Sequence, residues 1–267
     1  MEEDGRGWRK RDFFIYFFKD FFVNHFFYSY ICILCVVYNF ISSKMVGTYN
    51  IHNLTEIEKK HSPQNLYYKG NLSLLEKGRR VSVVGSREVS PQGIKRTEMV
   101  VKILLENNIV VVSGLAQGVD TVAHTTTIQK GGKTIAVIGT PLNQYYPKEN
   151  QRLQEQIASE HLLVSQFPEN YPSTSKNFPI RNRTMALISD ATIIIEASEK
   201  SGTKHQGWEA LRLGRRLYIL ENVIKDKNIS WAEEMLKYGA EVLTRDNVYQ
   251  LVEDIPFLTN KEVDYAF

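Results

Sequence analysis

Two short apolar runs, each followed by a loop of small residues and then an amphipathic segment, constrain the fold most. Residues 81–85 (VSVVG) precede one such loop and a helical segment that begins near Ser90, and residues 109–113 (IVVVS) repeat the pattern. Strands buried on both faces read as continuous apolar runs, and strands that alternate with helices form parallel sheets. The sequence therefore predicts an α/β fold with a doubly wound, mostly parallel sheet and helices on both of its faces.

The alternation continues along the chain. Further strands are expected at 134–139, 162–165, 191–196, 217–220 and 240–243, with helical segments between them. No repeat or low-complexity linker divides this region, so we predict one domain over residues 80–253. Residues 45–79 are interpreted as a lead-in with weak helical character at 54–60 and a turn at Gly70, and residues 254–267 as a tail.

Residues 1–44 differ sharply in composition from the rest of the chain, because they hold most of its 13 phenylalanines. They also hold Cys32 and Cys35, a C-x-x-C pair without the second Cys or His pair that a zinc site needs. The apolar stretch at 21–42 is long enough to cross a bilayer as a helix. We interpret Met45 as the true start of the protein, with an amino-terminal membrane anchor as the alternative.

The remaining composition is that of an ordinary globular protein. The chain has 267 residues, 43% hydrophobic content and a formal net charge of +3, which is only mildly basic. A nucleic-acid partner must therefore be argued from local clusters of charge and not from the whole chain. We expect a cytoplasmic protein without a metal site or cofactor, and without a membrane contact unless residues 1–44 are expressed.

Ligands of doubly wound sheets bind outside the carboxyl ends of the strands, so the loops there are the candidate site. In the first loop, Gly85 allows a close backbone approach and Arg87 can bind a phosphate through two parallel hydrogen bonds. The second loop carries Gly114 and Gly118 before a helix that begins near Asp120. On that helix we interpret Asp120 as an N-cap or a loop anchor and not as a catalytic acid, and His124 as a packing or hydrogen-bonding residue and not as a base.

The loop before the helical segment near 180 carries aromatic and cationic residues together. Residues 177–183 (NFPIRNR) are expected to bring Phe178, Arg181 and Arg183 together at a helix start. Single-stranded nucleic acids are bound by stacking of their bases on aromatic rings and by pairing of their phosphates with cations. The alternative is a helix-capping loop with Phe178 in the core. No G-x-S-x-G elbow is present, so a hydrolase triad has no candidate nucleophile.

Six motifs, taken in order, resemble the DprA/Smf DNA-processing family. They are VVGSR at 83–87, SGLAQGVDTVAH at 113–124, GG-x-TIAVIGT at 131–140, YPKEN at 146–150, NFPIRNR at 177–183 and EASEKSGT at 196–203. The resemblance implies a Rossmann-like fold that binds single-stranded DNA without an enzymatic step. It also implies a homodimer that loads the recombinase RecA onto incoming DNA during natural transformation.

Carried over by position, the resemblance implies DNA contacts at Arg87, Lys148 and Arg181, with Arg183 and Phe178 as neighbours. The loops that shape the pocket would contribute Gly85, Ser86, Ser113, Gly114, Gly118, Asp120, Gly202 and Thr203.

Two alternatives to a DNA-binding protein remain open. One is a nucleotide sensor or an enzyme similar to the nucleoside-monophosphate phosphoribohydrolases, which share the Gly-Thr loop after a strand. Those enzymes place catalytic acids directly after that loop, whereas this chain has Lys204 and His205 there, and Glu209 only later. The other is a membrane-tethered component of DNA uptake, which depends wholly on residues 1–44.

Overall fold

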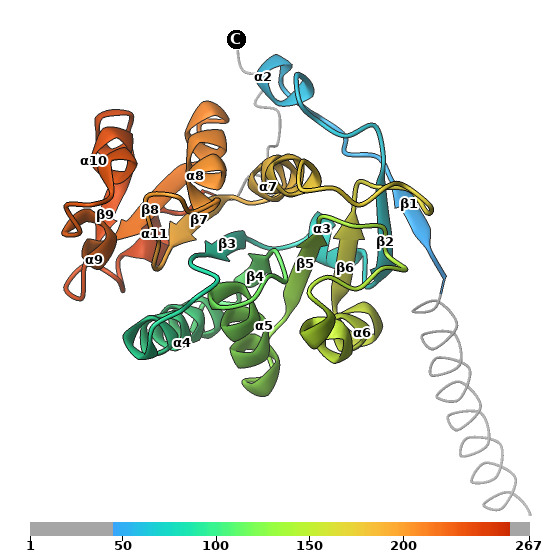
Figure 1. Cartoon of the computed structure of the whole chain (residues 1–267), viewed down its shortest axis with the longest axis horizontal. Helices are drawn as coiled ribbons and strands as arrows, with labels where there is room; N and C mark the ends of the chain where they lie inside the picture. The colour runs from blue at the N-terminus through green and yellow to red at the C-terminus, as the bar shows by residue number, and fades with distance from the viewer. Residues whose placement is uncertain (1–44, 257–267) are drawn as a thin grey trace, which may run out of the picture. The chain divides into compact units, whose positions relative to one another are not determined.

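The computed structural model describes residues 45–256, and within this range nine strands form one sheet (Figure 1). The strands are β1 (Gly47–Tyr49), β2 (Leu66–Gly70), β3 (Arg80–Val84), β4 (Val110–Ser113), β5 (Thr134–Ile138), β6 (Leu162–Ser165), β7 (Ala191–Ile194), β8 (Arg216–Leu220) and β9 (Glu241–Leu243). Their order across the sheet is β1-β2-β6-β5-β4-β3-β7-β8-β9. All neighbours from β6 to β9 are parallel, which confirms the predicted mostly parallel sheet.

Helices cover both faces of the sheet, as predicted (Figure 1). On one face lie α4 (Pro91–Glu106), α5 (Val119–Gln129) and α6 (Gln151–Glu160), and on the other lie α7 (Asn177–Leu187), α8 (Thr203–Arg212) and α10 (Ser230–Lys237). The shorter elements are α2 (Glu56–Lys59), α3 (Ser73–Glu76), the 3-10 helix η1 (Lys148–Asn150), α9 (Glu221–Ile224) and α11 (Leu251–Asp254).

The core consists of two apolar layers because successive side chains of a strand point to opposite faces. In β3, Val81 and Val83 pack in the cluster that contains Leu104 of α4, whereas Val84 packs in the cluster that contains Met185 of α7. Every residue of β3 is buried. This burial on both faces explains the continuous apolar run in the sequence.

The direction in which the sheet is wound reverses between β3 and β7. The two strands are hydrogen-bonded neighbours, with Val84 opposite Ile194 at their carboxyl ends. The helix that follows β3 covers one face of the sheet, and the helix that follows β7 covers the other. The loops after these strands therefore diverge and leave a crevice, which is where doubly wound folds bind their ligands.

The lead-in at 45–79 differs from the expectation because it adds two antiparallel strands to the sheet. β2 pairs with β6, with Tyr68 opposite Val164, and β1 pairs with β2. The expected helical character is confined to α2, and Gly70 ends β2 with a φ of +99°. These strands were missed because they are short and their partner, β6, lies far away in the sequence.

The expectations about the start at Met45, a membrane anchor, Cys32 and Cys35, and residues 257–267 of the tail lie outside the described residues. Between residues 45 and 256, no helix combines the length and the apolar character needed to span a membrane.

Candidate functional site

A pocket of about 700 Å³ opens at the carboxyl ends of β3 and β7, where the winding of the sheet reverses. The loop after β3, the loop after β7, α7 and the start of α8 all contribute to its wall. Predicted site residues that line it are Gly85, Ser86, Arg87, Asp120, Phe178, Arg181, Gly202 and Thr203. The sequence therefore identified the loops that meet here, although they are far apart along the chain.

One part of the site is an exposed cation beside an aromatic ring. The guanidinium carbon of the exposed Arg87 lies 5.6 Å from the centre of the half-buried Phe178 ring. The ring of Tyr146 packs against Phe178 with 5.1 Å between the ring centres. On its inner side Phe178 faces Gly139, where a Cβ atom would come within 2.8 Å of the ring. The inner side of the Phe178 ring thus packs directly against the backbone of Gly139.

Backbone hydrogen bonds hold the loop that carries Arg87. The amide of Ser86 donates to the carbonyl of Glu196 after β7 at 2.7 Å, and the amide of Val119 in α5 donates to the carbonyl of Ser86 at 3.1 Å. Gly118 has a φ of +75°, and a Cβ atom there would overlap the carbonyl oxygens of Ser86 and Arg87. Only glycine fits this approach of the two loops without strain.

Arg181 is buried in the wall of the pocket, with 5% of its surface exposed. Its guanidinium donates to the carbonyl of Gly114 and, at 2.8 Å, to the carbonyl of Val137, and its Nε donates to Asn182 at 3.0 Å. Burial lowers the pKa of Arg181, and Asp120 nearby opposes this effect by favouring the charged form. Arg181 therefore joins the ends of β4 and β5 to α7, and its direct contact with DNA stays a prediction.

Asp120 is a loop anchor, one of the two roles expected from the sequence, whereas the N-cap of α5 is Gly118. Its carboxylate accepts hydrogen bonds from the amides of Gly114 at 3.2 Å and Ala116 at 3.3 Å. Burial raises the pKa of Asp120, while Arg181 and the two amides favour the carboxylate. A Cβ atom on Gly114 would collide with both charged side chains, so this glycine lets them approach the same loop.

His124 and Ser113 have packing roles in the core beside this loop. His124 is fully buried, and its Nδ1 lies 2.7 Å from the hydroxyl of Thr134. Burial lowers the pKa of His124 to about 3, so the imidazole is neutral in the folded protein. The hydroxyl of Ser113 donates to the carbonyl of Val83 at 2.7 Å and ties β4 to β3, behind the pocket.

Arg183 and Lys148 do not line the pocket. Residues 178, 179, 181, 182 and 185 of α7 line the pocket and position 183 does not, so the grouping of Arg183 with Phe178 and Arg181 stays a prediction. Arg183 is exposed. Lys148 is also exposed, in η1, two residues after the ring of Tyr146 that packs on Phe178. DNA contacts by these two residues stay predictions.

Glu196 and Lys200 are among the pocket residues that the sequence analysis did not name as site residues. Glu196 accepts hydrogen bonds from the amide of Ser90 at 2.9 Å and from its hydroxyl at 2.6 Å, so it holds the start of α4. Lys200 lines the pocket from the loop after β7 and is exposed. The available signal was their position at the end of the strand expected at 191–196 and in the loop after it, because that strand ends on the same side of the sheet as the strand before Arg87.

The chain matches the family model described as DNA recombination-mediator protein A over residues 48–255. It is 43% identical over 183 residues to the DNA processing protein DprA of Streptococcus pneumoniae and 30% identical over 194 residues to that of Bacillus subtilis. The matched regions cover 68% and 73% of this chain, but only 64% and 65% of those two proteins.

Two solved structures share the fold. The DprA structure from S. pneumoniae superimposes with a TM-score of 0.70 at 36% identity, covering 81% of this chain and 76% of that one. The DNA processing protein A from Helicobacter pylori, whose structure was described for its single-stranded DNA binding mode, gives a TM-score of 0.66 at 25% identity, covering 79% and 96%. By sequence and by fold, the chain belongs to the DNA recombination-mediator protein A family, the DprA/Smf DNA-processing proteins.

Proposed function

We propose that this protein binds single-stranded DNA in the pocket between β3 and β7, and that this binding is its role in DNA processing. The observation that carries the proposal is Arg87, an exposed guanidinium, beside Phe178, a half-buried aromatic ring that lines the same pocket. A single strand offers both a phosphate for the cation and an unpaired base for the ring. A duplex offers only its phosphates there, since its bases are stacked inside the helix. The single-stranded DNA binding described for the H. pylori relative supports the same ligand.

We infer that the protein protects incoming DNA and loads the recombinase RecA onto it as a cytoplasmic homodimer. This part of the proposal is supported by the family resemblance of the loops. The recombinase step is tested by measuring whether the protein shortens the lag of RecA filament formation on single-stranded DNA. Light scattering coupled to size-exclusion chromatography tests the dimer.

We propose that the bound DNA is not chemically changed. Three acids line the pocket, and two of them are already committed, Asp120 to backbone amides and Glu196 to Ser90. The third, Glu88, is exposed in the loop after β3 and does not follow the Gly-Thr loop. Glu209, the acid that follows the Gly-Thr loop at a distance, pairs with Arg212 at 2.6 Å and does not line the pocket. The phosphoribohydrolases place their catalytic acids directly after the Gly-Thr loop, where this chain has Lys204 and His205, so the arrangement favours binding over catalysis.

Fluorescence anisotropy of the full chain with labelled oligo-dT and with the matching duplex tests the proposal. Each cation that contacts a single strand contributes about 0.7 to the slope of log affinity against log salt, so three or four contacts predict a slope of about 2 to 3. Arg87→Ala should lower that slope by about 0.7. Lys77→Ala, which removes an exposed charge before β3, is the matched control.

Equal binding of single strand and duplex would contradict the proposal. Failure to bind any DNA at low salt would do so too, and nucleotides would then be screened against the same pocket.

A further inference from the structure

A second groove of about 440 Å³ lies at the same edge of the sheet, between α4 and the segments that follow β8 and β9. Four cations line it, whereas Glu221 is the single acid in the lining that the structure describes. The cations are Lys95 and Arg96 of α4, Lys225 after α9 and Arg245 after β9. The site proposed above uses none of them.

Two of these cations are available to bind an anion. Glu221 pairs with Lys225 at 2.7 Å, and Arg96 lies 3.9 Å from Glu196. Within residues 45–256, Lys95 and Arg245 form no ion pair, and both are exposed. The groove therefore concentrates positive charge on a chain whose net charge is only +3.

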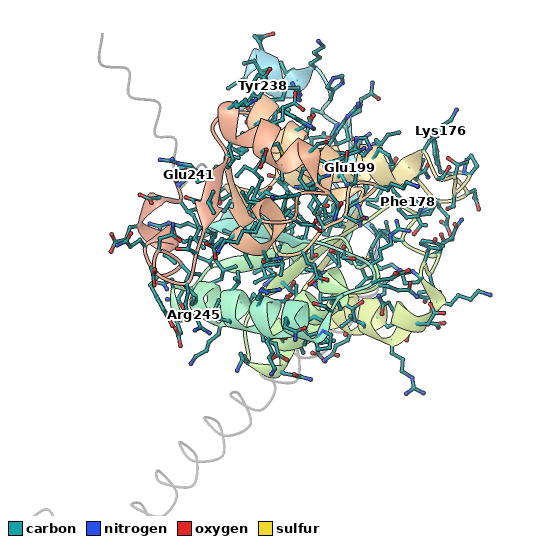
Figure 2. All side chains as sticks on the ribbon, turned by 60° about the vertical axis from the view of Figure 1, so that its left-hand side comes forward. Lys176, Phe178, Glu199, Tyr238, Glu241 and Arg245 are labelled. Carbon is teal, nitrogen blue, oxygen red and sulfur yellow. The ribbon has the colours of Figure 1, made fainter. Side chains whose placement is uncertain are left out.

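The groove adjoins the first pocket at the contact between Glu196 and Arg96. Glu196 lines the first pocket, and Arg96, which faces it at 3.9 Å, lines the groove. Figure 2 shows Phe178 of the first pocket and Arg245 of the groove well apart on the molecule. One mononucleotide cannot reach both, but a polymer of phosphates can.

We propose that the groove is a second subsite for the same DNA strand, which holds the phosphates of nucleotides beyond the first pocket. The inference rests on the proposed function, since it extends the path of that strand. No aromatic residue lines the groove within the described part of the chain, so its contacts are with phosphates and not with bases. Binding there is therefore independent of sequence and sensitive to salt.

The test compares two lengths of oligo-dT on the full chain by anisotropy in a salt series. One strand has about 6 nucleotides and the other about 16, near the two ends of known single-strand site sizes. The variant is Lys95→Ala with Arg245→Ala. The matched control is Lys77→Ala with Lys237→Ala, which removes two exposed charges from segments that precede β3 and β9 at the opposite edge of the sheet.

For the longer strand, the Lys95/Arg245 variant should lower the salt slope by about 1.4, twice the contribution of one contact. Its affinity for the shorter strand should stay unchanged, and the control should bind both strands as the wild type does. The second subsite would be overturned if the Lys95/Arg245 variant bound the longer strand with the wild-type affinity and salt slope. It would also be overturned if this variant lost the same affinity for both strands, or if the control lost as much affinity for the longer strand as the variant does. Failure of the wild type to bind the shorter strand would instead overturn the proposed function.

Discussion

The guanidinium carbon of Arg87 lies 5.6 Å from the centre of the Phe178 ring, and that of Arg181 lies 6.0 Å from the same ring. The two cations differ in exposure, since Arg87 is exposed and Arg181 is buried. The ring therefore lies near both a cation that can reach a ligand and a cation that holds the surrounding backbone.

Phe178→Leu should weaken single-strand binding by about 1 to 3 kcal/mol, the contribution of stacking one base. Leucine fills much of the same volume but offers no aromatic face. The salt slope should stay at its wild-type value, because no charge is lost. Anisotropy with oligo-dT measures both quantities. Tyr238→Leu, at an aromatic residue that is 65% exposed and does not line the pocket, is the control, and an equal loss there would contradict a role for Phe178 in stacking.

Arg181→Ala should lower the free energy of unfolding by about 1 to 3 kcal/mol, because the buried carbonyls of Gly114 and Val137 lose their donors. Arg183→Ala, on the same helix but exposed, should change it by no more than about 0.5 kcal/mol. Urea unfolding followed by circular dichroism checks both variants. Equal stability of the two would show that the hydrogen bonds of Arg181 do not hold the loops.

The contrast between these two arginines shows what the sequence could not predict. Apolar runs such as residues 81–85 predicted the parallel strands, and glycines after the strands predicted the loops of the pocket. The orientation of a charged side chain depends on which carbonyls other strands present to it. Gly114 and Val137 belong to segments far from α7 in the sequence, so the burial of Arg181 had no local signal.

The antiparallel strands beside β6 show the same limit of prediction from the sequence. β2 is recognisable only once β6 is beside it, because a short strand such as residues 66–70 depends on pairing more than on its own residues. The role of Glu196 was missed for a related reason. Its partner, Ser90, is brought close by the parallel pairing of β3 with β7.

Gly118→Ala should destabilise the protein more than Gly131→Ala does. Both glycines have a positive φ, +75° and +73°, so each substitution carries backbone strain of about 1 kcal/mol or more. Space is open around Gly131, whereas a Cβ atom at Gly118 overlaps the carbonyls of Ser86 and Arg87, which adds about 1 to 3 kcal/mol. Denaturant unfolding gives the two values. Equal losses of stability in the two variants would mean that the loop of Ser86 and Arg87 can move away from position 118 without a cost in free energy.

The stability of the protein should fall as the pH drops from about 6.5 towards 3, in part because of His124. Burial lowers the pKa of His124 to about 3 from an ordinary value of 6.5, so in this window the unfolded chain binds a proton that the folded chain does not. The difference contributes up to about 1.4 kcal/mol per pH unit. Burial also lowers the pKa of His161, which acts in the same direction.

His124→Gln should flatten this pH dependence, whereas His61→Gln, at an exposed histidine, should leave it unchanged. Urea unfolding at pH 7, 6, 5 and 4 compares the slopes, and these slopes are independent of any uniform loss of stability in the variant. A slope for His124→Gln that equals the wild-type slope would show that the folded protein binds this proton as readily as the unfolded chain.

Ultraviolet cross-linking of oligo-dT to the full chain, followed by mass spectrometry of the linked peptides, tests most directly whether DNA lies in the pocket between β3 and β7. The account predicts linked peptides that contain Phe178 or Tyr146, and a loss of these links in Arg87→Ala. Links confined to the opposite edge of the sheet, such as residues 73–79, and unaffected by Arg87→Ala, would contradict it.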